Sequence, residues 1–221
     1  TGNGTSTGAP VRAYYVDNLS VINTRFTSVA DKAIDAVELW DTTFIATVFE
    51  NCNGADGTKP AVHLRNASAP TGFGSSSDNT NMVYFMNCRF EAFKDGAAWI
   101  ERGDASNTNN PNGIHFIACK FENHTTRGKF VYFDDATMLC SVQDSDFFVG
   151  AFDSGYSTPV DALVCNAVSS VTLRGLRFVT SEAAGTMNTG INVYSGEGPV
   201  LIENIEQRGA NAPVGSLIYF A

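Results

Sequence analysis

A six-residue block recurs along the chain and constrains its fold more than any other sequence feature. Every block opens with an apolar residue. The first six close on phenylalanine five positions later and carry Asn, Ala, Asp or Gly at the third position. Because Asn, Asp and Gly tolerate left-handed backbone angles, the block predicts a strand, a tight turn and a second strand, with the phenylalanine returned to the interior. The blocks are 21–26, 44–49, 85–90, 116–121, 142–147 and 173–178, and a degraded seventh covers 200–205.

A second family of short strands alternates with these blocks. Most members alternate apolar and mixed residues, which is typical of strands with one buried side. They recur at intervals of a few tens of residues, as the coils of a solenoid do. The expected strands are 13–16, 37–40, 62–65, 98–101, 131–134, 163–166, 191–194 and 217–220. We therefore predict an all-β fold, a right-handed parallel β-helix solenoid of about seven coils that forms a single domain over residues 1–221.

Three polar stretches interrupt the strands, at 68–77, 103–112 and 150–159, and we expect them to project as loops. An antiparallel sandwich is the rival architecture, and it would use Asn53-Gly54 and Asn112-Gly113 as hairpin turns. That fold gives the Phe-closed repeat no role, so we favour the solenoid.

Charge and cysteine content narrow the range of partners. The formal net charge is −9 over 221 residues, and because an acidic surface repels phosphate groups, no nucleic acid is expected as a partner. No apolar run approaches the ~18 residues that span a bilayer, so no membrane insertion is expected. The five cysteines include no CxxC pair. We therefore expect neither a metal nor a cofactor, and we predict that the thiols pack in the core.

The apolar-x-Asn-x-x-Phe block resembles the second strand, short turn and third strand of the pectin-lyase-like superfamily of right-handed β-helices. The alternating family resembles its first strand, and the resemblance extends over nearly the whole chain. It implies the fold but leaves the activity open, because this fold serves lyases, hydrolases, epimerases and phage tail proteins. Gly2-Asn3-Gly4-Thr5 is similar to a Gly-rich coil segment of the family, and the strand at 217–220 has no cap, so we expect a fragment of a longer chain.

Stacked coils place equivalent residues about 4.8 Å apart, so the outward positions of the alternating family form columns. These positions combine aromatic rings with carboxylates and one arginine. Sugar rings dock on aromatic faces and sugar hydroxyls pair with charged groups, so we predict a glycan-binding groove here. The expected substrate-binding residues are Glu38, Trp40, His63, Arg65, Trp99 and Tyr132.

Glu101 and Asp134 fall in one column on neighbouring coils, with backbones about 5 Å apart. Carboxylates at such a separation suit a retaining glycosidase, and those about 6.5–9.5 Å apart suit an inverting one. Two stacked carboxylates repel each other and raise one pKa, as a general acid requires. We therefore predict this pair as the catalytic residues, although acid pairs also arise without function in an acidic chain.

Ile22, Ile45, Met86 and Ile117 form an outward apolar column on the first strands of the Phe-closed blocks. Monomers avoid exposed patches of this kind, so we expect something to cover the column. Tailspike-like β-helices associate as parallel homotrimers, and the resemblance therefore implies a homotrimer with this column at its interface. A covering loop or an upstream segment is the alternative.

The leading hypothesis is a bacteriophage tailspike or tail-fibre module located in the virion tail. It would recognise a bacterial surface polysaccharide or lipopolysaccharide glycan and, with Glu101 and Asp134 as catalytic residues, depolymerise it. Two alternatives stay open: a secreted monomeric polysaccharide lyase or hydrolase, and a non-catalytic structural shaft.

Overall fold

The computed structural model describes residues 10–52, 60–66, 80–93, 95–102, 110–126, 129–134, 138–152, 160–180, 187–194, 198–209 and 216–221. The segment from Gly2 to Thr5 and the stretch 68–77 lie outside the described residues, as do most of 103–112 and 150–159. The expectations for these segments therefore stay predictions.

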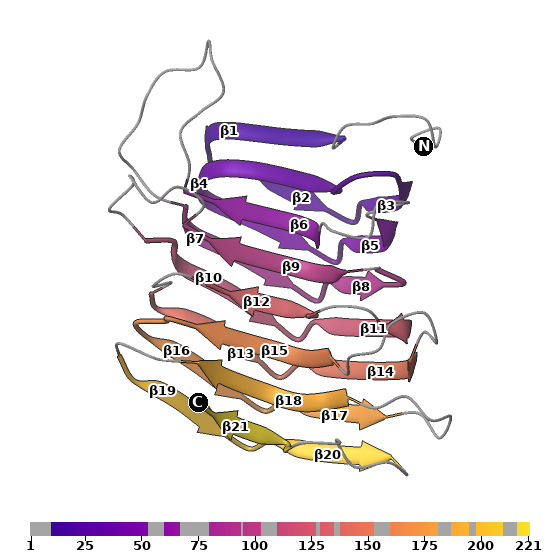
Figure 1. The fold of residues 1–221 in the computed structure, drawn as a ribbon. Coiled ribbons are helices and arrows are strands. Elements are labelled where there is room, and N and C mark those ends of the chain that lie inside the picture. Colours follow the sequence, from indigo (N-terminus) through magenta and orange to yellow (C-terminus); the bar gives the residue numbers. More distant parts are fainter. Residues whose placement is uncertain are drawn as a thin grey trace.

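The described residues form strands and no helix, and every strand pairing is parallel. The strands belong to a 14-stranded and a 7-stranded sheet. In Figure 1 they are stacked in layers, from β1 (Val11–Asp17) at the top to β20 (Glu206–Gly209) at the bottom. This arrangement is compatible with a parallel β-solenoid, and it rules out the antiparallel sandwich for the described strands.

The 14-stranded sheet consists of two ladders joined through the long strand β4 (Ile34–Ile45), which pairs with both β6 (Pro60–Arg65) and β7 (Asn81–Met86). The first ladder contains β1, the first half of β4, β6, β9 (Gly96–Glu101), β12 (Val131–Phe133), β15 (Val160–Asn166), β18 (Met187–Tyr194) and β21 (Ile218–Phe220). The second ladder contains β2 (Ser20–Ile22), the second half of β4, β7, β10 (Asn112–Ile117), β13 (Cys140–Gln143), β16 (Val171–Arg174) and β19 (Val200–Glu203).

The 7-stranded sheet is the third ladder. It contains β3 (Arg25–Val29), β5 (Val48–Cys52), β8 (Arg89–Glu91), β11 (Lys120–Thr126), β14 (Asp146–Phe152), β17 (Arg177–Thr180) and β20. Each of these strands follows a second-ladder strand after a short turn, which is the arrangement that the six-residue block predicts.

The turn position of every block is left-handed, as predicted. Its φ angle lies between 48° and 63° in Asn23, Ala46, Asn87, Ala118, Asp144, Gly175 and Asn204. Alanine pays roughly 1–2 kcal/mol for this conformation. The coil-to-coil hydrogen bonds offset that strain, since the amide of Ala118 donates to the carbonyl of Gln143 at 3.0 Å. The seventh block starts at Ile202 rather than at Val200, because Ile202 is level with Leu173 and Asn204 takes the turn position.

The interior is built on two files of phenylalanine rings. The closing phenylalanines stack from coil to coil with ring centroids 4.8 to 5.4 Å apart; they are Phe26, Phe49, Phe90, Phe121, Phe147 and Phe178. A second file of Phe44, Phe85 and Phe116 has centroids 4.7 Å apart. Each such ring pair adds about 0.5–1.5 kcal/mol beyond the area it buries, so the files hold the coils in register.

The five cysteines are buried and form no disulfide, as the repeat predicts. Cys88 and Cys119 lie directly after the turn residues and donate their thiol hydrogens to the carbonyls of Phe44 and Phe85, at 3.4 and 3.3 Å. The two thiols thus provide hydrogen-bond donors for backbone carbonyl groups on the preceding coil. The thiols therefore have a structural role in the core.

One part of the predicted register is wrong. The strand segment level with His63 is centred on Asp35 and not on Glu38, and Val37 is level with Arg65. Glu38 instead takes a left-handed φ of 55° at a corner inside β4, after which Trp40 pairs with Asn81 of the second ladder. The expected strand 37–40 therefore straddles a corner.

Candidate functional site

The outward positions of the first ladder form two columns of mostly polar and aromatic side chains, which we call the first-ladder face. One column runs through Asp35, His63, Trp99, Tyr132, Val164 and Asn192. The other runs through Val37, Arg65, Glu101, Asp134, Asn166 and Tyr194. From His63 onward these are the columns that the sequence predicts.

His63 lies between two carboxylates on neighbouring coils. Its Nε2 atom is 2.5 Å from Oε1 of Glu101, and its Nδ1 atom is 3.9 Å from Oδ1 of Asp35. The same Asp35 oxygen accepts hydrogen bonds from Nη2 of Arg65 at 2.6 Å and from Nζ of Lys32 at 3.2 Å. Five charged or titratable groups from three coils thus form one network.

Burial lowers the pKa of His63, and the hydrogen bond with Glu101 opposes this shift without reversing it. The imidazole is therefore neutral at pH 7 and donates its Nε2 hydrogen to the Glu101 carboxylate. That hydrogen bond lowers the pKa of Glu101. Burial alone would raise the pKa of Asp35, but the positive charges of Arg65 and Lys32 outweigh it, so the pKa is lowered and both carboxylates are ionised at neutral pH.

Trp99 is the aromatic centre of the face. Its ring meets His63 edge-on at 6.5 Å and Tyr132 edge-on at 6.1 Å between centroids. A Cβ atom on Gly96 would lie 2.3 Å from Nε1 of Trp99, so glycine at this position allows the indole to lie against the backbone. The Lys129 ammonium stands 3.7 Å from the Tyr132 ring centroid, a cation–π contact.

On the later coils the carboxylates accept hydrogen bonds from asparagine side chains instead of from Arg and Lys side chains. Asn166 donates from Nδ2 to Oδ1 of Asp134 at 2.6 Å. Asp161 accepts one hydrogen bond from Asn188 at 2.8 Å and another from Asn192 at 2.7 Å. Burial raises the pKa of Tyr132, and the neighbouring Asp134 carboxylate raises it further, so the phenol stays protonated as a hydrogen-bond donor. The first-ladder face thus carries carboxylates along its length. Their partners are His63 and cations on the early coils and asparagine side chains on the later coils.

Glu101 and Asp134 are level on neighbouring coils, as expected, because the amide of Asp134 donates to the carbonyl of Ile100. Their side chains take partners on opposite sides: Glu101 bonds to His63 on the preceding coil, and Asp134 bonds to Asn166 on the following coil. The raised pKa expected of a general acid is wrong for Glu101, whose pKa is lowered by His63. The geometry therefore suits hydrogen-bond acceptance better than acid catalysis by Glu101.

Two predicted substrate-binding residues lie away from this face. Glu38 is fully buried at the corner of β4, and Trp40 belongs to the second half of that strand. Sequence reasoning also missed Lys32, Asp35 and Lys129 as members of the face. The alternation in Ile34-Asp35-Ala36-Val37 was a signal for Asp35, since it fits the strand pattern as well as 37–40 does.

The predicted apolar column on the second ladder is in register. Ile22 is level with Ile45, Ile45 with Met86 and Met86 with Ile117. Ile22 and Met86 are 53% and 37% exposed, and Ile45 and Ile117 are half-buried. The column continues into polar residues on the later coils, which are Gln143, Arg174 and Glu203.

In the described segments no group of three or more His, Cys, Asp or Glu side chains could hold a metal ion. Those segments also contain no helix long and apolar enough to cross a membrane. Comparison with protein-family models, curated proteins and solved structures finds no match to this chain.

Proposed function

We propose that this chain is a pectin-lyase-like right-handed β-helix module of about seven coils that binds a bacterial surface polysaccharide along its first-ladder face. The parallel strands support the fold, and crossover connections between parallel strands of one sheet are right-handed in about 98% of cases. Three ladders that repeat through each winding support the coil number.

The observation that carries the glycan proposal is the environment of Trp99. This partly exposed indole lies between His63 and Tyr132, and charged groups that accept and donate hydrogen bonds border it in the next column. An aromatic platform bordered by fixed polar groups suits the apolar faces and the hydroxyls of sugars. Because Trp99 and Tyr132 are level on neighbouring coils, the face suits more than one sugar residue.

The geometry favours binding over cleavage. The hydrogen bond to His63 and the lowered pKa keep Glu101 ionised, whereas a glycosidase acid must be protonated. A depolymerase that uses Glu101 and Asp134 is therefore a secondary proposal. In it Asp134 acts as the general acid and Glu101 as the ionised carboxylate. Loss of cleavage in both Glu101→Gln and Asp134→Asn, with binding retained, would support it.

Trp99→Ala tests the binding proposal. We expect affinity for the bound oligosaccharide, identified on an array of bacterial surface glycans and measured by calorimetry, to fall by roughly 1–3 kcal/mol. Trp40→Ala is the matched control, because Trp40 lies outside the two columns. Equal affinities in the wild type and in Trp99→Ala, or binding to no glycan of the array, would contradict the proposal.

We further propose a parallel homotrimer of the tailspike type, located in a virion tail, with the apolar column of Ile22, Ile45, Met86 and Ile117 at its interface. The exposure of Ile22 and Met86 supports it, since monomers avoid exposed apolar patches. Light scattering is expected to give the mass of three chains and, for Met86→Lys, the mass of one. A wild-type mass of one chain would favour a secreted monomer, and a trimer that binds no glycan would favour a structural shaft.

A further inference from the structure

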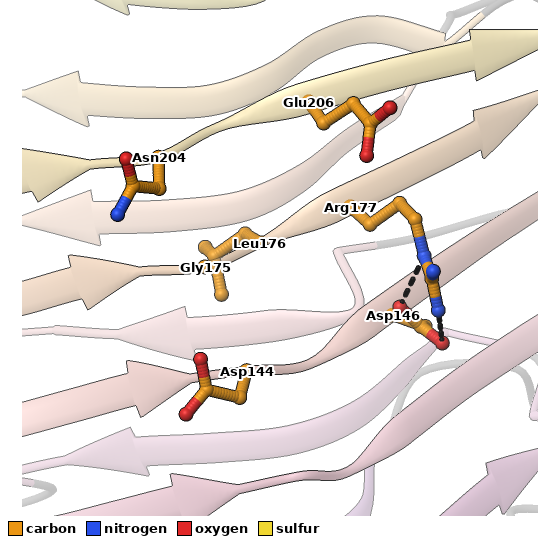
Figure 2. Close-up of a pocket in the computed structure, with 7 residues that line it drawn as sticks. All are labelled: Asp144, Asp146, Gly175, Leu176, Arg177, Asn204 and Glu206. Atoms are coloured by element: carbon orange, nitrogen blue, oxygen red, sulfur yellow. Dashed lines mark hydrogen bonds and ion pairs between the residues drawn. The ribbon is translucent and has the colours of Figure 1, made fainter.

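A polar notch lies at the turn between the second and third ladders, away from the columns of the first-ladder face. Its volume is about 290 Å³. The residues that line it come from three consecutive coils and are Asp144, Asp146, Gly175, Leu176, Arg177, Asn204 and Glu206 (Figure 2). Ligand pockets start at about 300 Å³, so the notch has room for one small ring and not for an oligosaccharide.

The notch exists because Gly175 has no side chain. Asp144, Gly175 and Asn204 are consecutive left-handed turn residues, and Figure 2 shows Gly175 between the other two. A Cβ atom on Gly175 would lie 2.4 Å from Oδ1 of Asp144. The Asp144 carboxylate therefore lies against the glycine backbone, and the turn residues Asp144 and Asn204 on either side of it are two strand spacings, about 9.6 Å, apart.

Arg177 forms one side of the notch in a fixed orientation. Its Nε atom donates to Oδ1 of Asp146 at 2.7 Å, and its Nη2 atom pairs with the other oxygen of the same carboxylate. This two-point contact raises the pKa of Arg177 and neutralises one carboxylate. Glu206 is level with Arg177 on the next strand and continues the same side of the notch.

The turn residues supply the other side. Within the described parts of the chain, no side-chain hydrogen bond joins Asp144 or Asn204 to another side chain, so their polar atoms are available to a ligand. Asp146 pairs with Arg177, and Glu206 accepts a hydrogen bond from Nε of Arg208 at 2.7 Å. Among the described residues Asp144 has no ion-pair partner, so the notch carries one uncompensated negative charge and disfavours anions. It offers carboxylate oxygens to hydroxyl or ammonium groups, and an amide that both donates and accepts.

We propose that this notch is a second sugar subsite, which holds one uncharged or amino-bearing sugar residue between Asp144 and Asn204. The choice of a saccharide as ligand rests on the proposed function, whereas the preference for uncharged or cationic ligands follows from the charges of the notch. The subsite is independent of Trp99, so the two sites can be tested separately.

The test is a titration of the isotope-labelled protein, followed through its backbone amide signals, with D-glucosamine, D-glucose and D-glucuronate as probes. We expect saturable shifts at Gly175, Leu176 and Asn204, largest with glucosamine, smaller with glucose and absent with glucuronate. Gly175→Ala should weaken glucosamine binding at least about tenfold, a loss of about 1.4 kcal/mol.

Alanine is compatible with this turn position, since Ala46 and Ala118 occupy it with φ angles of 49° and 52°. The matched control is Ala118→Gly, which makes the reverse change on another coil and should leave binding unchanged. Asp144→Asn is a second variant that keeps the shape and removes the charge, and it should weaken glucosamine more than glucose.

No saturable shift with glucosamine or glucose would overturn the inference, as would equal binding by Gly175→Ala. Glucuronate bound as tightly as glucosamine would overturn the charge argument. Trp99→Ala should leave these titrations unchanged. Failure of the first-ladder face to bind glycans is therefore distinguishable from failure of the notch.

Discussion

The outward sides of the first and second ladders differ more than any other two regions of this molecule. The first-ladder face joins Asp35, Arg65 and Lys32 in a partly buried network of opposite charges. The second ladder presents Ile22 and Met86 to solvent in a column with no charge on its early coils. Both ladders rest on the same repeated core. The repeat fixes the core positions and leaves the outward side chains free to vary. The two faces therefore differ in charge and polarity although they share one core.

The largest expected effect comes from the core that the two faces share. Phe90 is fully buried and stacks on Phe49 and Phe121, at 4.8 and 4.9 Å between ring centroids. Phe90→Ala should lower the free energy of unfolding by about 3–5 kcal/mol, because it leaves a cavity in the middle of the file. Urea denaturation measures this. Phe26→Ala at the end of the file should cost less, and equal losses would contradict the shared-core account.

The next effect isolates the first-ladder face. Asp35→Asn removes the carboxylate that Arg65 and Lys32 share, so two cations face each other without their common partner. We expect a loss of about 1–3 kcal/mol in the free energy of unfolding. Asp41→Asn is the control, because this exposed residue should change stability by no more than about 0.5 kcal/mol. Similar values for both variants would mean that the network adds nothing.

The pH dependence of stability compares the two faces directly. Burial lowers the pKa of His63 on the first ladder and of His115 on the second below the ordinary value of 6.5. The folded protein then binds fewer protons than the unfolded chain. The contribution of these two histidines to the free energy of unfolding is fully present above pH 6.5, and it is lost as the pH falls toward their lowered pKa values.

His63→Gln and His115→Gln should each flatten part of this acid limb in urea denaturation between about pH 5 and 8. At His63 the hydrogen bond with Glu101 opposes the effect of burial, whereas burial alone lowers the pKa of His115. The lowered pKa values of Asp35 and Glu101 act in the same direction at lower pH, where protonation removes their stabilising charges. An unchanged limb in His63→Gln would show that its protonation does not differ between the folded and unfolded states.

The smallest effect tests the second ladder. Ile22 is mostly exposed and its substitution should change the stability of a single chain by less than about 0.5 kcal/mol, so Ile22→Ser is expected to be nearly neutral in dilute solution. Thermal denaturation over a range of protein concentrations measures this. If the melting temperature of the wild type rises with concentration and that of Ile22→Ser does not, the column is an interface.

The sequence by itself determined the parallel coils, the left-handed turns and the phenylalanine file. These features repeat, and each follows from local physics: Asn87 and Gly175 tolerate positive φ, and Phe90 needs burial. The outward columns from His63 onward followed from the same repeat.

Only the tertiary structure decided the register of β4, since Ile34-Asp35-Ala36-Val37 and Val37-Glu38-Leu39-Trp40 both alternate as strands do. Hydrogen bonds to the neighbouring coil selected the first of them and put Glu38 at a buried corner. The notch depended on structure for the same reason. Gly175 reads as a turn residue, and the gap that it leaves is set by Asp144 and Asn204, which are brought beside it by coils distant in sequence.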